Sequence, residues 1–241
     1  MSLVFSWKRS SVYTSDYAIC KDKEWLGDRV ISFCYDFFEC VTFKSIASGV
    51  VLVKPGTAHL IVGEKDEGDL LDLVNDIGIS SSDKRIICTP INNNSFNGKG
   101  GGSHWSFLAF DRQQQKFFHY DSMRASNVSH AKAFAKKVTP FVLKSDDEKG
   151  AKPNLDQSNF ISVVCPQQAN GYDCGVFVVA FTQFLLSRIV DKKSLHDDSF
   201  ESDLAKAVTS KTVTALRGSM VNWMEEARKL DENERVQKKK K

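Results

Sequence analysis

The sequence predicts an α+β fold, chiefly from the order in which its hydrophobic patterns occur. Segments with helical periodicity come first, a few strand-like segments that include a hairpin follow, and helical segments return at the end. A length of 241 residues and a hydrophobic content of 41% suit one domain with a substantial core. We therefore expect a single domain over residues 1–230 and a charged, disordered tail over residues 231–241.

The individual elements are expected from apolar periodicity and from turn residues. Helices are expected over residues 29–43, 67–77, 128–143, 174–190, 204–216 and 220–230. Strands are expected over residues 85–91, 103–110, 116–120 and 160–164, after one or two extended segments within residues 1–20. Asp28 is the expected N-cap of the first helix, Pro55-Gly56 a turn, and Gly218 a break between the last two helices. The Asn- and Gly-rich residues 92–102 are expected to form a mobile loop.

Composition argues against several classes of function. The formal net charge is +3, and the four lysines at 238–241 account for more than all of it, so no nucleic-acid partner is expected. No apolar run is long enough to cross a membrane and no signal-peptide pattern is present, so we expect no membrane partner. The six cysteines lack metal-ligand spacing, which predicts no metal and a reducing location in the cytoplasm, the nucleus or both.

Cys174 opens the apolar segment 174–190 and is the candidate nucleophile. A helix N-terminus carries about half a positive charge, which stabilises a thiolate. Gly175 would leave the backbone beside the sulfur uncrowded, so that a substrate carbonyl can approach. Gln168 lies six residues earlier, across the Asn-Gly turn at 170–171, and can donate its amide to an oxyanion. A buried structural cysteine at the start of a core helix is the alternative interpretation.

A cysteine nucleophile needs a base and a group that orients the base, and His104 and Asp121 are the candidates. If the hairpin turn holds two or four residues, the numbers of paired residues add up to 225 or 227. Either sum places His104 and Asp121 on one face of the sheet. The carboxylate would then accept from one imidazole nitrogen and leave the other for Cys174. Taken singly, each of the two is more often a strand-end or turn residue without a chemical role.

These residues together resemble a known family. The matching motifs are His104-Trp105, Tyr120-Asp121-Ser122, Gln168 with Cys174-Gly175 after it, and Trp25-Leu26-x-Asp28. They are similar to the Ulp-type proteases of ubiquitin-like proteins, the sentrin/SUMO-specific cysteine peptidases, over about residues 5–190. The run 117–122 and the Gly-rich loop before His104 look most like the branch that removes the Nedd-type modifier, called Rub in plants and fungi.

The resemblance implies a papain-like fold with a central, mostly antiparallel sheet, a buried helix carrying the nucleophile, and flanking helices. It implies a thiol isopeptidase and C-terminal hydrolase that cleaves after Gly-Gly of the modifier. Cys174 would be the nucleophile and His104 the general base and acid. Asp121 would orient His104, and Gln168 would be the oxyanion donor. No cofactor is implied.

The resemblance also implies how the modifier is bound. Trp25 and Trp105 would wall a narrow channel that only glycines can pass, because a Cβ would clash with the indoles. Asp28 would contact the modifier, although Gly27 stands where the family usually has Asn. Core or lid packing is the alternative for both tryptophans. The implied partners are a Nedd/Rub-type modifier and its conjugates, such as cullins, with the protein acting as a monomer.

Three alternatives stay open on the sequence. A SUMO-removing protease would use the same catalytic residues. An acyltransferase on the same scaffold would need a basic acyl-CoA site, and no compact basic cluster lies near His104 or Cys174 in the sequence. A catalytically silent binding module would not need four catalytic residues.

Overall fold

The computed structural model describes residues 2–94, 101–144 and 153–238. The strands are β1 (Leu3–Trp7), β2 (Ser10–Tyr13), β3 (Val50–Leu52), β4 (Ile86–Asn92), β5 (Trp105–Asp111), β6 (Lys116–Tyr120) and β7 (Phe160–Ser162). The α-helices are α1 (Thr14–Lys21), α2 (Asp28–Phe37), α3 (Pro55–Gly63), α4 (Glu67–Asp76), α5 (Val128–Val142), α6 (Cys174–Val190), α7 (Phe200–Ala207) and α8 (Ser210–Lys238). A π-helix, η1 (Phe38–Thr42), and a 3₁₀-helix, η2 (Lys44–Gly49), follow α2.

The strands form two sheets within the described residues. β1 and β2 make an antiparallel hairpin, and the other strands form a five-stranded sheet in the order β3-β4-β5-β6-β7. The central pairs β4-β5 and β5-β6 are antiparallel, whereas the outer strands β3 and β7 each pair in parallel. The α+β class is confirmed, and the sheet expected to be mostly antiparallel is mixed because both outer strands run parallel to their neighbours.

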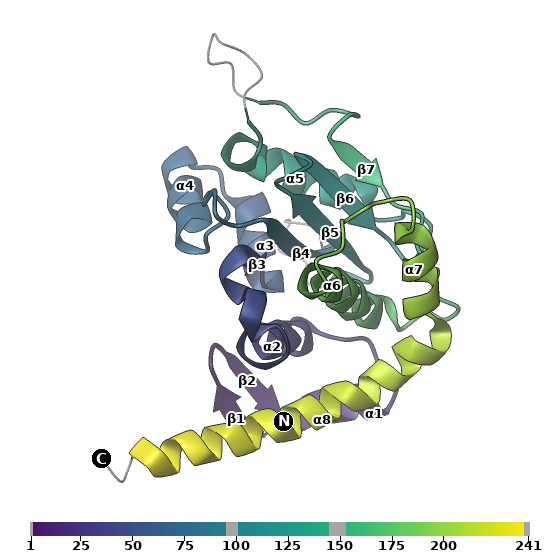
Figure 1. The fold of residues 1–241 in the computed structure, drawn as a ribbon. Helices are drawn as coiled ribbons and strands as arrows, with labels where there is room; N and C mark the ends of the chain where they lie inside the picture. The colour runs from purple at the N-terminus through teal and green to yellow at the C-terminus, as the bar shows by residue number, and fades with distance from the viewer. Residues whose placement is uncertain (1, 95–100, 145–152, 239–241) are drawn as a thin grey trace.

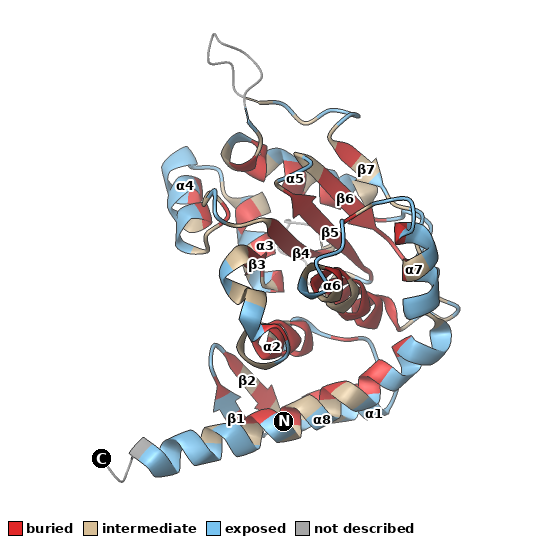
Figure 2. Ribbon diagram, viewed as in Figure 1, coloured by how far each residue is buried: buried red, intermediate tan, exposed pale blue. Residues whose placement is uncertain are grey.

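Helices cover both faces of the five-stranded sheet (Figure 1). α2 and α6 lie on one face, with α8 crossing beneath them, and α3, α4 and α5 lie on the other. Successive residues of β5 serve the two sides: Phe107 and Ala109 pack with α6, while Leu108 and Phe110 pack with α5. Burial is concentrated in the sheet and in α6 (Figure 2), so the candidate nucleophile starts a helix held inside the core.

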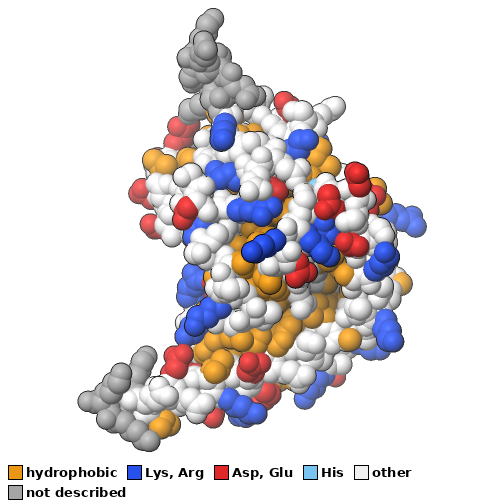
Figure 3. Space-filling model, viewed as in Figure 1, with side chains coloured by type: hydrophobic (Ala, Val, Ile, Leu, Met, Phe, Trp, Pro, Cys, Tyr) orange, Lys and Arg blue, Asp and Glu red, His pale blue; other side chains and the backbone are white. Residues whose placement is uncertain are grey.

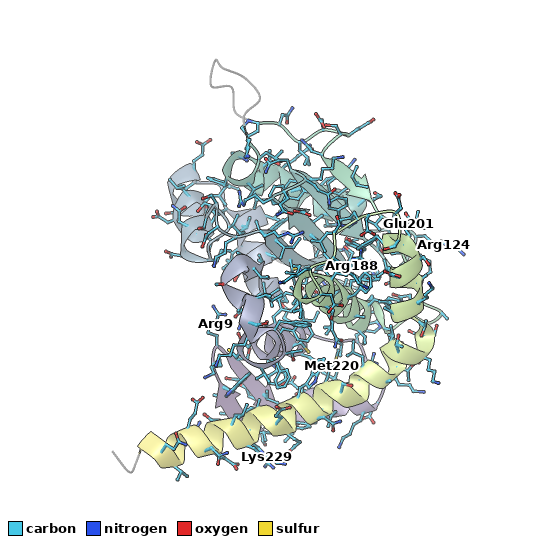
Figure 4. All side chains as sticks on the ribbon, in the orientation of Figure 1. Arg9, Arg124, Arg188, Glu201, Met220 and Lys229 are labelled. Atoms are coloured by element: carbon cyan, nitrogen blue, oxygen red, sulfur yellow. The ribbon has the colours of Figure 1, made fainter. Side chains whose placement is uncertain are left out.

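The C-terminal helix differs from the expectation. The sequence predicts two helices that break at Gly218 and then a disordered tail, but α8 runs without interruption from Ser210 to Lys238. Its buried apolar residues recur every three or four positions and are Val213, Leu216, Met220, Met224 and Ala227. This stripe packs on the body and outweighs the low helix propensity of one glycine. Figure 4 shows Met220 on the side facing the body and Lys229 on the opposite side. The disordered tail is wrong for residues 231–238, and residues 239–241 lie outside the described part.

Two further expectations near the N-terminal half are corrected. The helix expected over 29–43 is an α-helix only to Phe37 and continues as the π-helix η1 to Thr42. Asp28 is its first residue rather than its cap, which is Gly27. Pro55 was expected in a turn, but it is the first residue of α3. Proline is favourable there because the N–H of the first helical residue makes no intrahelical hydrogen bond. Of the loop expected over 92–102, residues 95–100 lie outside the described residues. No helix in the described part combines the length and apolarity needed to cross a bilayer.

Candidate active site

Three separate elements bring His104, Asp121 and Cys174 together. His104 directly precedes β5, Asp121 directly follows β6, and Cys174 is the first residue of α6. In the hairpin Phe107 pairs with Tyr120, so paired numbers add up to 227 and the predicted register is confirmed. Nε2 of His104 lies 2.7 Å from Oδ1 of Asp121, and both residues are buried.

Asp121 is held by backbone groups as well as by His104. Its Oδ1 accepts from the backbone N–H of Met123 at 2.9 Å, and its Oδ2 accepts from that of Asn127 at 2.8 Å. Burial raises the pKa of Asp121, but the hydrogen bonds from His104, Met123 and Asn127 outweigh it and leave this pKa below its ordinary value. The carboxylate is therefore charged and fixed in orientation.

The ring of His104 interacts with both Asp121 and Cys174. Burial lowers the pKa of His104, but the interactions with Asp121 and with the Cys174 thiol outweigh it and raise the pKa to about 9. Nδ1, the nitrogen that Asp121 leaves free, is buried and has no hydrogen-bond partner of good geometry among the described residues. The ring and the thiol are thus close neighbours, as proton transfer between them requires.

A side-chain clamp fixes the backbone on which His104 sits. Oδ1 of Asn93, just after β4, accepts from the backbone N–H of Ser103 at 2.7 Å and of His104 at 3.0 Å. The Asn93 N–H in turn donates to the His104 carbonyl at 3.2 Å. The start of β5 is therefore tied to the end of β4 where the loop between them begins.

Gln168 is held in the loop before α6 with its amide plane fixed. Its Oε1 accepts from the Ser122 hydroxyl at 2.7 Å, and its Nε2 donates to the Asn170 carbonyl at 2.6 Å. The backbone N–H of Gln168 also donates to the Ser122 carbonyl at 2.9 Å. A primary amide has two N–H groups, so this arrangement leaves a second donor for a developing oxyanion.

Trp25, Trp105 and Asp28 lie in three different environments. Trp25 is 53% exposed, and its indole donates to the Gly171 carbonyl at 2.7 Å. Trp105 is buried on the α6 side of the sheet and donates to the Leu26 carbonyl at 3.0 Å. Asp28 is exposed in the first turn of α2. Trp25 is thus tied to the loop before α6, and Trp105 is tied to the segment that carries Trp25.

Gly175 has a different role from the one expected. A Cβ at this position would lie 2.8 Å from Cβ of Leu26 and 3.4 Å from Cδ1 of Trp105. The glycine therefore allows α6 to pack against the segment that follows Trp25. The expectation that it clears space for a substrate carbonyl is replaced by this contact with the protein itself.

Sequence reasoning missed the polar residues behind Asp121. The Asn127 side chain donates to the Ile91 carbonyl at 2.9 Å and to the Ser106 hydroxyl at 3.0 Å, and Nε2 of His119 lies 2.9 Å from the same hydroxyl. Burial lowers the pKa of His119 to about 4, although the charge of Asp121 opposes this, so the ring is neutral near pH 7. The register alone could have found Ser106, which faces Asp121, whereas Asn127 comes from a loop without a pattern.

No group of three or more potential metal ligands occurs in the part of the chain that the structure describes. The side chains brought together at the site are a thiol, an imidazole and a carboxylate. A thiol so placed can attack a carbonyl, and the imidazole can transfer the protons.

Comparisons with known proteins agree with this geometry. The chain is 28% identical to human sentrin-specific protease 8 over 90% of its length and 93% of that protein. It is 33% identical to the NEDD8-specific protease 1 of Arabidopsis thaliana, over 73% of this chain and 72% of that one. The fold is similar to a crystal structure described as the de-sumoylating protease, with a TM-score of 0.66 and 17% identity over 99% of this chain and 95% of that one. Residues 74–221 match the Ulp1 protease family, C-terminal catalytic domain, and the chain belongs to that family.

Proposed function

We propose that the protein is a cysteine peptidase that cleaves after the Gly-Gly end of a ubiquitin-like modifier of the Nedd/Rub type. The observation that carries the proposal is the 2.7 Å bond between His104 and Asp121 beside a thiol at a helix N-terminus. A buried carboxylate that orients an imidazole in this way allows the imidazole to activate a neighbouring thiol.

The reaction follows from the positions of the groups. Nδ1 of His104 takes the proton of Cys174, and the thiolate attacks the carbonyl of the last glycine. The second N–H of Gln168 donates to the oxyanion that forms. His104 then gives its proton to the leaving amine, and a thioester to the modifier remains. Water, deprotonated by His104, hydrolyses the thioester and releases the modifier and the free thiol.

Two features support a ubiquitin-like modifier as the substrate. The indole of Trp25 is fixed by a hydrogen bond to the loop before Cys174 and that of Trp105 by one to the segment that carries Trp25, and bulky walls so fixed suit a thin extended tail without side chains. The Nedd type is supported by the printed names of the human and Arabidopsis relatives. We extend the proposal to conjugates of this modifier, such as cullins, with the protein acting as a monomer in the cytoplasm, the nucleus or both.

The test compares C-terminal fluorogenic amides of Nedd-type, SUMO-type and ubiquitin modifiers as substrates. The Nedd-type substrate should have the highest kcat/KM. Cys174→Ala should abolish its turnover and still bind the modifier in calorimetry, because only the sulfur is removed. Cys40→Ala, at a half-buried cysteine of η1, is the matched control and should retain activity. Undiminished turnover by Cys174→Ala would refute the mechanism, and a preference for the SUMO-type substrate would favour the SUMO-removing alternative.

A further inference from the structure

We propose that Arg217 is a positioning residue that fixes the two walls of the substrate site relative to each other. It lies on α8, far along the chain from the other groups of the site, and it is 4% exposed. The inference rests on the proposed function, because it concerns how that site is held ready for the modifier tail.

The guanidinium of Arg217 contacts three segments at once. Nε donates to Oδ1 of Asp173 at 2.9 Å, and Nη2 lies 2.8 Å from the same oxygen in an ion pair. Nη2 donates to the backbone carbonyls of Glu24 at 2.9 Å and Tyr172 at 3.2 Å, and Nη1 donates to that of Ile19 at 3.0 Å. These bonds use all three nitrogens of the planar guanidinium, which a lysine could not reproduce from a single nitrogen.

Two of these contacts adjoin residues of the site. Asp173 directly precedes Cys174, and Glu24 directly precedes Trp25. The indole of Trp25 joins the same two segments a second time through its bond to Gly171. Trp25 is more than half exposed, so burial alone does not hold it, and its position depends on how these segments are tied together. Arg217 joins the segment before Trp25 to the segment before Cys174 on their buried side.

Asp173 binds Arg217 and Asn170 with its side chain and does not cap its own helix. It is the N-cap residue of α6, but its side chain makes no capping hydrogen bond. Oδ1 is taken by Arg217, and Oδ2 accepts from the Asn170 side chain at 2.8 Å. The same Asn170 lies against Gln168, whose amide donates to the Asn170 carbonyl. The position of the oxyanion donor is thus linked to Arg217 through the loop.

A second buried arginine provides a control that distinguishes a positioning role of Arg217 from a purely structural one. Arg188, near the other end of α6, is 3% exposed and binds Asp197 and Asp203 at 2.8 and 2.9 Å. It lies about 20 Å along the helix from Cys174. Arg188→Lys therefore disturbs the ion pairs of another buried arginine, at the far end of α6, without touching the site, and it is the matched control for Arg217→Lys.

The experiment measures two rates for each variant. One is kcat/KM for the C-terminal coumarin amide of a Nedd-type modifier, and the other is alkylation of Cys174 by iodoacetamide, a small reagent that does not use the contacts that bind the modifier tail. Arg217→Lys should lower kcat/KM at least about tenfold, mainly by raising KM, because small misplacements of binding groups have large effects. Its alkylation rate should stay within about twofold of wild type. Arg188→Lys should leave both rates within about twofold.

The outcomes that would overturn the inference are distinct. Equal kcat/KM for Arg217→Lys and Arg188→Lys, or an alkylation rate that falls as far as kcat/KM, would refute the positioning role. Asp173→Asn keeps the shape of the pair and gives the same comparison if Arg217→Lys does not fold. Combining Arg217→Lys with Trp25→Phe should lower kcat/KM by less than the product of the single effects, and full additivity would contradict a path through Trp25. A wild-type protein without turnover of any modifier would refute the proposed function itself.

Discussion

The behaviour of His104 depends on the groups around it more than on the ring itself. Asp121 accepts three hydrogen bonds through its two oxygens and remains charged. The backbone N–H of Asn127 is one of the three donors, and the Asn127 side chain donates to the Ser106 hydroxyl. The same hydroxyl is a hydrogen-bond partner of the neutral His119. The sequence could predict that His104 and Asp121 share a face, because strand alternation is local and regular. It could not predict this support, since it depends on a loop folding back onto β4.

The raised pKa of His104 predicts the alkaline limit of activity. The ring keeps its proton up to a pKa of about 9, and the protonated ring pairs with the thiolate and protonates the leaving amine. We expect kcat/KM to decline as the pH rises through about 9. Asp121→Asn removes a charge that raises this pKa, so the decline should begin at lower pH and the maximum should be lower. A pH profile of each protein measures this, and identical alkaline limbs would disprove the assignment of Asp121.

Gln168 should contribute to rate rather than to binding. Its amide is fixed by Ser122 and Asn170, so the remaining N–H is preorganised for the oxyanion. Gln168→Ala should lower kcat by about a hundredfold or more with little change in KM. Steady-state kinetics with the Nedd-type amide measure both constants. A variant as fast as wild type would exclude Gln168 as the donor.

At the scale of elements, the sequence predicted buried helices well and their ends poorly. α6 was expected over residues 174–190 and has those bounds, because a long apolar run in this setting has no other stable arrangement. The prediction placed a helix break at Gly218, within α8, because glycine has low helix propensity. The packing of Leu216 and Met220 on either side of Gly218 overrides that local preference, and such contacts are not visible in the local sequence.

The continuity of α8 leads to a stability prediction at Gly218. This residue is exposed in the middle of the helix, and a Cβ there would meet nothing within 4 Å. Gly218→Ala should raise the free energy of unfolding by about 0.5–1 kcal/mol, because it removes backbone entropy from the unfolded chain. Urea denaturation measures the change, and kcat/KM should equal that of wild type. Destabilisation by this substitution would show that α8 is interrupted at Gly218 in solution.

At the scale of the whole molecule, the sheet joins two hydrophobic clusters and α8 closes one of them. On the face shown in Figure 3, hydrophobic side chains gather between α8 and the elements above it. The antiparallel centre of the sheet could be predicted from the hairpin, which is close in sequence. The strand β7 was expected within residues 160–164, but β3 and the parallel pairing of both outer strands were not, because each is three residues long and pairs with a strand far along the chain.

The distribution of buried residues along α8 predicts which part of it the domain needs. The buried stripe ends at Ala227, and beyond it Lys8 and Glu234 form an exposed ion pair at 3.2 Å. Such pairs contribute at most about 1 kcal/mol. Deleting residues 231–241 should therefore change the free energy of unfolding by no more than about 1 kcal/mol and leave kcat/KM intact. Deleting residues 210–241 removes the stripe and Arg217 and should prevent folding. A large loss of stability from the shorter deletion would place the domain boundary beyond residue 230.

The Asn93 clamp couples the chemistry of the site to strand β4. Because one side-chain oxygen binds the N–H groups of both Ser103 and His104, the backbone that carries the imidazole takes its position from the end of β4. The orientation of the base is thus inherited from a strand that contributes no catalytic side chain. A change at the end of that strand would reach the proton-transfer apparatus through a single amide group.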